Sequence, residues 1–114
     1  MTVQEVAEKL DLEVLTAGAG LEREVSGGYA GDLLSDVIAH ARAGDAWVTL
    51  QTHGNVVAVA SLKELPAVIH VNGRKPGAGT LEKARAEGVA LLCTPLPAFE
   101  LAGRLYQMGL RGCR

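Results

Sequence analysis

Polar side chains that could bind a ligand gather in three glycine-containing loops, each directly after a β-like run. The loops read Ser26-Gly27-Gly28-Tyr29-Ala30-Gly31-Asp32, Gln51-Thr52-His53-Gly54-Asn55 and Asn72-Gly73-Arg74. In an α/β chain with parallel strands, such loops emerge at the edge of the sheet where the strands end, which is where these folds bind ligands. We therefore expect a ligand site at this carboxyl edge, lined by Tyr29, Asp32, Thr49, His53, Asn55 and Arg74.

The residue types at this edge suit an anion. His53 could donate to an anionic ligand or exchange a proton near neutral pH, although a loop histidine bonded to the backbone explains it equally well. Asn55 and the amides after it could form an anion-binding helix start, with simple helix capping as the alternative. Arg74 and Lys75 could meet a phosphate, or be solvated loop charges.

Catalytic chemistry has less support in the sequence. No nucleophile, base and orienting group stand at a telling spacing, and the first glycine loop does not match the G-x-G-x-x-G spacing. Asp32 and Asp45 could hold a metal with His53, but a helix cap and a turn residue are their ordinary roles, so we predict no metal and no cofactor. His70 and Cys93 lie in apolar runs and are interpreted as a hydrogen-bonded core histidine and a small buried hydrophobe.

Composition sets limits on the class of protein. The 114 residues suit one domain, and because apolar residues make up 48% and aromatic residues only 4%, the core must be aliphatic. A net charge of −2, spread along the chain, argues against nucleic-acid or membrane binding. Two distant cysteines and no apolar signal segment indicate a reduced, cytoplasmic protein.

Helical and strand-like patterns alternate along the chain. Thr2 and Glu5 form a capping box for a helix over 3–10, two short strands at 12–16 and 24–29 are expected to pair with each other, and Asp32 is expected to cap a helix that stops at Gly44. The remaining elements are strands at 46–51, 67–72 and 89–94 and helices at 55–64, 80–87 and 97–108, with Asn55 and Pro66 as the limits of the first of these helices. This order predicts a three-layer α/β/α sandwich with a mainly parallel sheet of four to five strands.

Several of these segments together resemble the DRTGG domain. The resemblance rests on Leu21-Glu22-Arg23-Glu24-Val25-Ser26-Gly27, Gly44-Asp45-Ala46-Trp47-Val48-Thr49, Ala67-Val68-Ile69 with Gly73, and Leu91-Leu92-Cys93-Thr94 before Ala98-Phe99-Glu100-Leu101-Ala102-Gly103-Arg104-Leu105. It covers nearly the whole chain, so we expect one DRTGG-like domain at 1–110 and a flexible tail at 111–114. Glu22-Arg23 departs from the Asp-Arg pair that is common in the family.

The resemblance implies an α/β/α fold and an accessory, regulatory role. The family is similar to the amino-terminal domain of HPr kinase/phosphorylase, and it accompanies CBS domains in other proteins. It does not imply kinase activity, because the chain has no G-x-x-x-x-G-K-[ST] phosphate loop.

Three functional hypotheses follow. The first is a non-enzymatic domain that senses a small anionic metabolite or nucleotide at the carboxyl edge. The second is a protein-interaction subunit that docks to an enzyme or kinase without a small ligand, and we expect a homodimer in both cases. The third, an enzyme using His53 with Asp32 or Asp45, has the least support.

Overall fold

Within residues 1–113, which the computed structural model describes, five strands form one sheet in the order β1-β5-β4-β3-β2. The strands from β2 to β5 are parallel, and β1 is antiparallel to β5. Their bounds are β1 Glu13–Val14, β2 Gly27–Ala30, β3 Asp45–Thr49, β4 Ala67–His70 and β5 Ala90–Cys93. The predicted mainly parallel sheet is confirmed.

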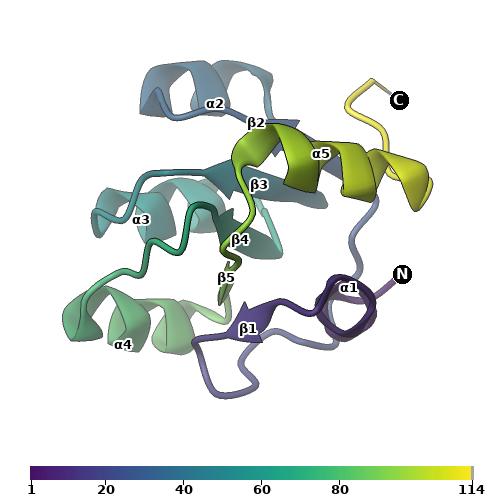
Figure 1. Ribbon diagram of the computed structural model, residues 1–114. Coiled ribbons are helices and arrows are strands. Elements are labelled where there is room, and N and C mark those ends of the chain that lie inside the picture. Colours follow the sequence, from purple (N-terminus) through teal and green to yellow (C-terminus); the bar gives the residue numbers. More distant parts are fainter. Residues whose placement is uncertain (114) are drawn as a thin grey trace.

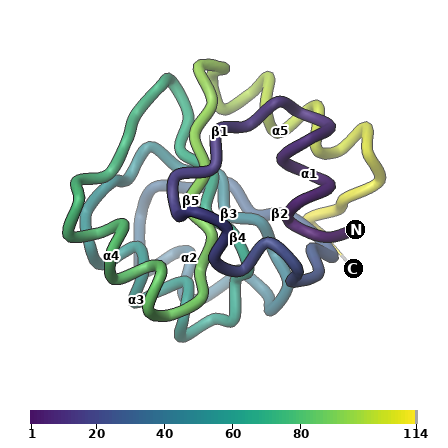
Figure 2. The backbone as a smooth tube through the Cα atoms, turned by 90° about the horizontal axis from the view of Figure 1, so that it is seen from below, coloured from purple at the N-terminus to yellow at the C-terminus, as the bar shows by residue number. Residues whose placement is uncertain are grey.

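Helices cover both faces of the sheet. Their bounds are α1 Val3–Leu10, α2 Leu34–His40, α3 Asn55–Leu62, α4 Ala78–Glu87 and α5 Ala98–Gln107. Figures 1 and 2 show α2, α3 and α4 on one face and α1 and α5 on the other. The strands from β2 to β5 follow one another across the sheet, so each crossover of the same hand returns its helix to the same face. The structure is the predicted three-layer α/β/α sandwich.

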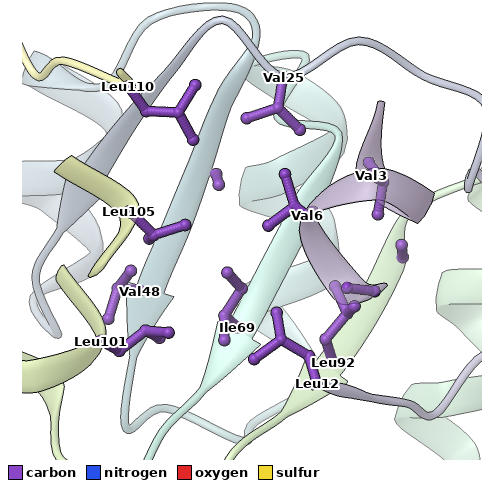
Figure 3. Close-up of a cluster of buried hydrophobic side chains, with 14 of the residues drawn as sticks. Val3, Val6, Leu12, Val25, Val48, Ile69, Leu92, Leu101, Leu105 and Leu110 are labelled. Atoms are coloured by element: carbon purple, nitrogen blue, oxygen red, sulfur yellow. The ribbon is translucent and has the colours of Figure 1, made fainter. Parts of the chain in front are cut away.

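Two aliphatic clusters, one on each face, hold the layers together. The first lies between the sheet and α1 and α5 (Figure 3), and the second lies under α2, α3 and α4. Alternate side chains of one strand enter different clusters: Ile69 belongs to the first and Val68 to the second. Because both faces are covered, the strands read as nearly continuous apolar runs. No helix within residues 1–113 is long and apolar enough to span a bilayer.

Two of the predicted helix ends are confirmed at the level of single hydrogen bonds. The Glu5 amide donates to Thr2 Oγ1 at 3.2 Å, and the Thr2 amide donates to Glu5 Oε1 at 2.9 Å, which completes the capping box of α1. Further along the chain, α4 stops at Gly88, which has a left-handed φ of 70°.

The expected pairing of the first two strands is wrong. Strand β1 pairs with β5 and β2 pairs with β3, so the two lie at opposite edges of the sheet. The segment between them crosses the amino-terminal edge, where the Arg23 guanidinium donates to the Gly88 carbonyl at 3.0 Å. There it pairs with the start of the chain, because the Val3 amide donates to the Arg23 carbonyl at 2.9 Å.

Two predicted caps of the middle helices are also wrong. Helix α2 starts after Leu33 rather than Asp32 and ends at His40, while Gly44 makes a left-handed turn before β3 with a φ of 90°. Helix α3 starts after Gly54, and Asn55 is its first helical residue. Asp32 instead accepts a hydrogen bond from Thr49 Oγ1, and the Asn55 amide donates to His53 Nδ1.

Helix α3 ends at Leu62, earlier than Pro66 would require, and Glu64 adopts a left-handed φ of 57°. In α5, Leu101 and Leu105 are buried, whereas Phe99 is 92% exposed. At the start of the expected tail, the Gly28 amide donates to the Arg111 carbonyl at 3.2 Å, so Arg111 lies beside β2. Arg114 lies outside the described residues.

Candidate functional site

Asp32 and Thr49 meet at the carboxyl edge, as the sequence predicted. Asp32 Oδ1 accepts from Thr49 Oγ1 at 2.8 Å and from the Leu50 amide at 2.7 Å. The Gln51 side-chain amide donates to the Asp32 carbonyl at 3.0 Å. Since Thr49 is buried and Asp32 is exposed, the carboxylate closes the end of β3 against the loop after β2. These contacts, rather than helix capping, are the role of Asp32.

His53 and Asn55 also meet, through one backbone hydrogen bond. The Asn55 amide donates to His53 Nδ1 at 3.1 Å, so the imidazole caps the first turn of α3. An acceptor Nδ1 in a neutral ring leaves the proton on Nε2. Because His53 is exposed, its Nε2–H is available to an acceptor from outside the domain. The backbone-bonded and the ligand-binding interpretations are therefore compatible.

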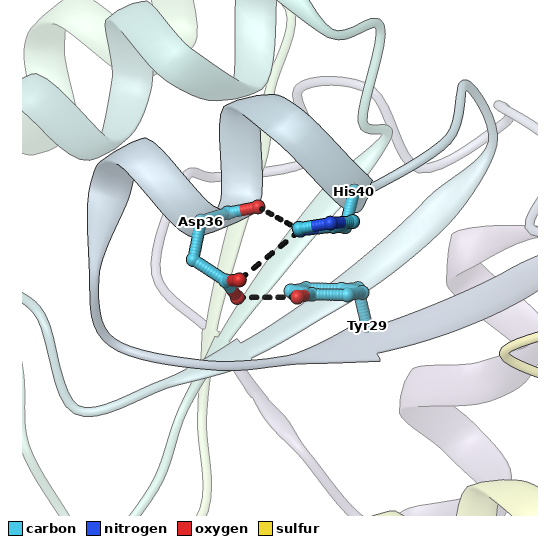
Figure 4. Close-up of polar contacts among 3 residues, drawn as sticks. All are labelled: Tyr29, Asp36 and His40. Carbon is cyan, nitrogen blue, oxygen red and sulfur yellow. Dashed lines mark hydrogen bonds and ion pairs between the residues drawn. The ribbon is translucent and has the colours of Figure 1, made fainter.

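Tyr29 does not join these residues. Its hydroxyl donates to Asp36 Oδ2 on α2, and Asp36 Oδ1 lies 3.1 Å from His40 Nδ1 (Figure 4). The hydrogen bond to Asp36, together with burial, raises the pKa of Tyr29. Neither Asp36 nor His40 was among the site residues predicted from the sequence. An acid and a histidine four residues apart on one helix would have indicated the pair.

Arg74 stands alone in the loop after β4. Its side chain is exposed and makes no hydrogen bond or ion pair within residues 1–113, while its carbonyl accepts from Cys93 Sγ at 3.3 Å. The neighbouring Lys75 differs, because its Nζ lies 3.0 Å from Glu13 Oε1. That contact raises the pKa of Lys75, and the Glu13 carboxylate partly offsets its positive charge. Arg74 is thus the cation of this loop that remains open to an anion.

A cleft of about 470 Å³ adjoins this loop at the β5 side of the carboxyl edge. It is lined by Asp11, Leu12, Glu13, Gly73, Lys75, Cys93 and Pro95. Burial raises the pKa of the Cys93 thiol, in keeping with its interpretation as a small hydrophobe. Glu13 was not among the residues predicted at this edge, because only the pairing of β1 with β5 brings it there.

A row of buried polar residues closes the ends of the three central strands. Thr49, His70 and Cys93 are register partners on adjacent strands. Neither ring nitrogen of His70 has a hydrogen-bond partner within the described chain, so the predicted hydrogen-bonded state is wrong. Burial lowers the pKa of His70 to about 4, and the backbone of Gln51 partly opposes this shift. His70 is therefore neutral at physiological pH.

Four of the six predicted residues thus form two contacting pairs, Asp32 with Thr49 and His53 with Asn55. Arg74 contacts neither pair, and Tyr29 is hydrogen-bonded to Asp36 on α2. Among residues 1–113, no three His, Cys, Asp or Glu side chains gather closely enough to hold a metal ion. Asp45, which was considered as a ligand, accepts from the Arg42 amide at 2.8 Å. The groups that remain exposed at the carboxyl edge can donate to an anion through His53 and Arg74.

No protein-family model and no curated protein matches the chain in sequence. The chain is similar to a crystal structure of the CBS and DRTGG domains of the regulatory region of Clostridium perfringens pyrophosphatase, complexed with its activator, diadenosine tetraphosphate. The TM-score is 0.70 at 19% sequence identity, over 96% of this chain and 47% of that one. This chain therefore spans about half the length of that structure. The likeness supports the resemblance drawn from the sequence, and the chain has the α/β fold of a DRTGG-like domain.

Proposed function

We propose that this chain is a non-enzymatic regulatory domain that binds a small anionic metabolite or nucleotide at the carboxyl edge of its sheet. The observation that carries the proposal is the shared fold with a regulatory region whose crystal structure contains a nucleotide activator. A dinucleotide polyphosphate is strongly anionic. The exposed donors at the carboxyl edge of this chain suit the same class of ligand.

His53 and Arg74 contact the anion in this proposal. Arg74 supplies an unpaired guanidinium, which binds phosphate oxygens in a bidentate manner, and His53 supplies its Nε2–H. Asp32, Thr49 and Asn55 position the loops that carry these two groups. Tyr29 acts at a distance, by holding α2 against β2 through Asp36.

The test is thermal unfolding of the purified protein with ATP, diadenosine tetraphosphate and inorganic pyrophosphate. A ligand at 100 times its dissociation constant adds about 2.7 kcal/mol to the free energy of unfolding. We expect one of these anions to raise the melting temperature of the wild type and not that of the His53→Ala/Arg74→Ala variant. Arg85→Ala removes another exposed arginine, from the last turn of α4 at the opposite edge, and should leave the shift intact. An equal loss in both variants would show a nonspecific charge effect.

A second candidate function is that of an accessory subunit that docks to an enzyme or kinase without a small ligand. Large exposed apolar side chains favour it: Leu33 is 68%, Leu62 69% and Phe99 92% exposed. If no anion stabilises a well-folded wild type, this candidate replaces the first. Substitutions at these apolar positions would then be the ones that abolish function.

A further inference from the structure

A pocket of about 120 Å³ lies between the edge strand β2 and helix α5. Its walls include, from the helix and from the sheet, Ala102, Leu105, Tyr106, Gly28, Ala30 and Val48. Figure 1 shows α5 beside β2, and Figure 3 shows Leu105 close to Val48. A closed cavity of about 150 Å³ holds a benzene molecule. This pocket, which opens to solvent, therefore has room for the apolar part of a small ligand, about the size of a ring or a short branched chain.

Small residues on β2 and α5 create this pocket. Tyr29 packs on the opposite face of the sheet, where its hydroxyl bonds to α2. Because side chains alternate along a strand, its neighbours Gly28 and Ala30 face α5. Ala102 lines the same pocket from the helix. None of these three residues has a side chain larger than a methyl group, so the space between β2 and α5 stays open.

Arg111 is the charged residue of the pocket lining, and its own chain holds it in place. Its carbonyl accepts from the Gly28 amide at 3.2 Å, which fixes its backbone beside β2. Its guanidinium lies 3.9 Å from the centroid of the Tyr106 ring, and Nη1 donates to the carbonyls of Tyr106 at 2.7 Å and Leu110 at 3.2 Å. The guanidinium is thus positioned before a ligand binds, which lowers the entropic cost of binding.

The other edge of the Arg111 guanidinium has donors to spare. The N–H groups of Nη1 are directed at backbone carbonyls, which leaves those of Nε and Nη2. Within residues 1–113, neither of these two nitrogens takes part in a hydrogen bond or an ion pair. An arginine edge of this kind matches the two oxygens of a carboxylate. An apolar pocket with such a group in its lining is typical of a site for an acid with an apolar body.

We propose that the pocket between β2 and α5 binds a small carboxylic acid. Its apolar body lies between the strand and the helix, and its carboxylate is held by Nε and Nη2 of Arg111. The lining contains one cation and no second one, so it suits a monoanion rather than a polyphosphate. The site is separate from the proposed anion site, because His53 and Arg74 follow β3 and β4 at the carboxyl edge and do not line this pocket.

The first experiment titrates the isotope-labelled protein with benzoate and with isovalerate, one probe with a ring and one with a branched chain, and follows the amide NMR signals. We expect saturable shifts at Ala30, Ala102 and Gly112 with at least one acid. The matching neutral amide, benzamide or isovaleramide, should bind at least tenfold more weakly because it lacks the charge. The proposal is overturned if neither acid shifts these signals, or if the amide binds as tightly as its acid.

The second experiment fills the pocket. Ala102→Leu places a large side chain in it and is expected to abolish binding of the acid. Gly103→Leu adds the same side chain one position further along α5, where a Cβ meets nothing within 4 Å, and should leave binding unchanged. Ala30→Val closes the pocket from the strand and tests the same point independently of the helix. Circular dichroism checks that each variant is folded. Unchanged affinity in folded Ala102→Leu and Ala30→Val proteins would refute the pocket as the binding site.

The third experiment removes the charge and measures the dissociation constant of the acid by isothermal titration calorimetry. Arg111→Gln is expected to raise this constant at least tenfold. Arg104→Gln removes a half-exposed arginine of α5 that does not line the pocket, and should leave the constant unchanged. Equal effects of the two substitutions would contradict the role of Arg111.

The same measurement on His53→Ala/Arg74→Ala separates the two proposed sites. This variant should bind the acid as the wild type does, even where it has lost the thermal response to nucleotides. Loss of acid binding in this variant would mean that the acid binds at the carboxyl edge, which would overturn the separate pocket.

Discussion

Asp32 and Thr49 are joined by a hydrogen bond of 2.8 Å that links the loop after β2 to the last residue of β3. The carboxylate also accepts from the Leu50 amide at 2.7 Å, so one oxygen serves two donors. Thr49 is 1% exposed, and water cannot replace the lost acceptor there. This pair therefore stabilises the junction between the loop after β2 and the end of β3.

Removal of this acceptor should destabilise the domain. Asp32→Ala is expected to lower the free energy of unfolding by about 1 to 3 kcal/mol, because it leaves a buried hydroxyl donor unsatisfied. Urea denaturation followed by circular dichroism measures the change. Glu82→Ala, at an exposed position of α4, serves as the control and should change stability by less than about 0.5 kcal/mol. Equal losses in the two variants would contradict a structural role for Asp32.

Acid should weaken the fold through His70. Its pKa is about 4 in the folded state because of burial, against 6.5 for an unperturbed histidine. The unfolded chain therefore binds the proton more readily, and stability present at neutral pH is lost as the pH falls from 6.5 toward 4. The pKa difference corresponds to about 3 kcal/mol.

The measurement is the free energy of unfolding as a function of pH in the wild type and in His70→Val. Carboxylates contribute to acid denaturation in both proteins, so the informative quantity is the difference between the two curves. The variant should show the shallower loss of stability between neutral pH and about pH 4. Parallel curves would mean that His70 is protonated as easily in the folded protein as in the unfolded chain.

Substitutions of His53 should distinguish its capping of α3 from its proposed role in ligand binding. His53→Ala removes the acceptor of the Asn55 amide and is expected to cost about 1 kcal/mol of stability. His53→Asn keeps a side-chain oxygen that can accept at a helix start, so most of the stability should return. Guanidinium denaturation of the three proteins tests this. If both variants are as stable as the wild type, the imidazole does not cap α3.

Gly20 should tolerate a side chain less well than Gly18. Both have a left-handed φ, 74° and 92°, so alanine at either position is strained. A Cβ at Gly20 would also lie 2.5 Å from the Gly88 carbonyl oxygen, whereas one at Gly18 would meet nothing within 4 Å. Gly20→Ala is therefore expected to lower the melting temperature more than Gly18→Ala in differential scanning calorimetry. The opposite order would mean that the close approach to Gly88 relaxes without cost.

Sequence patterns predicted the start of α1 and the end of α4 correctly because the residues that interact there are close together in the sequence. The capping box of Thr2 and Glu5 and the stop at Gly88 involve residues within one helical turn of the helix end, so nothing distant had to be known. Asp32 shows the limit of this reasoning. It has the residue type of a helix cap, but Thr49, 17 residues away, offers it a competing hydrogen bond.

The candidate site was predicted in part for the same reason. His53 and Asn55 are two residues apart, and their contact is local. Tyr29 was expected beside Asp32, but its ring extends across β2 to reach α2 at Asp36. Glu13 came to the carboxyl edge only because β1 pairs with β5, and no spacing in the sequence indicates that partner. Phe99 is apolar like Leu101 and Leu105, but at two residues from Leu101 it lies on the opposite side of α5 and is exposed.

The sequence by itself determined the order of helices and strands, the aliphatic core and the parallel layout, because hydrophobic period and turn residues act over a few positions. The tertiary structure alone decided which strand forms each edge, which polar groups meet at the carboxyl edge and which side of α5 remains open. Those outcomes depend on packing between segments far apart in the chain. The free energy of such contacts is set by the whole core rather than by any local pattern.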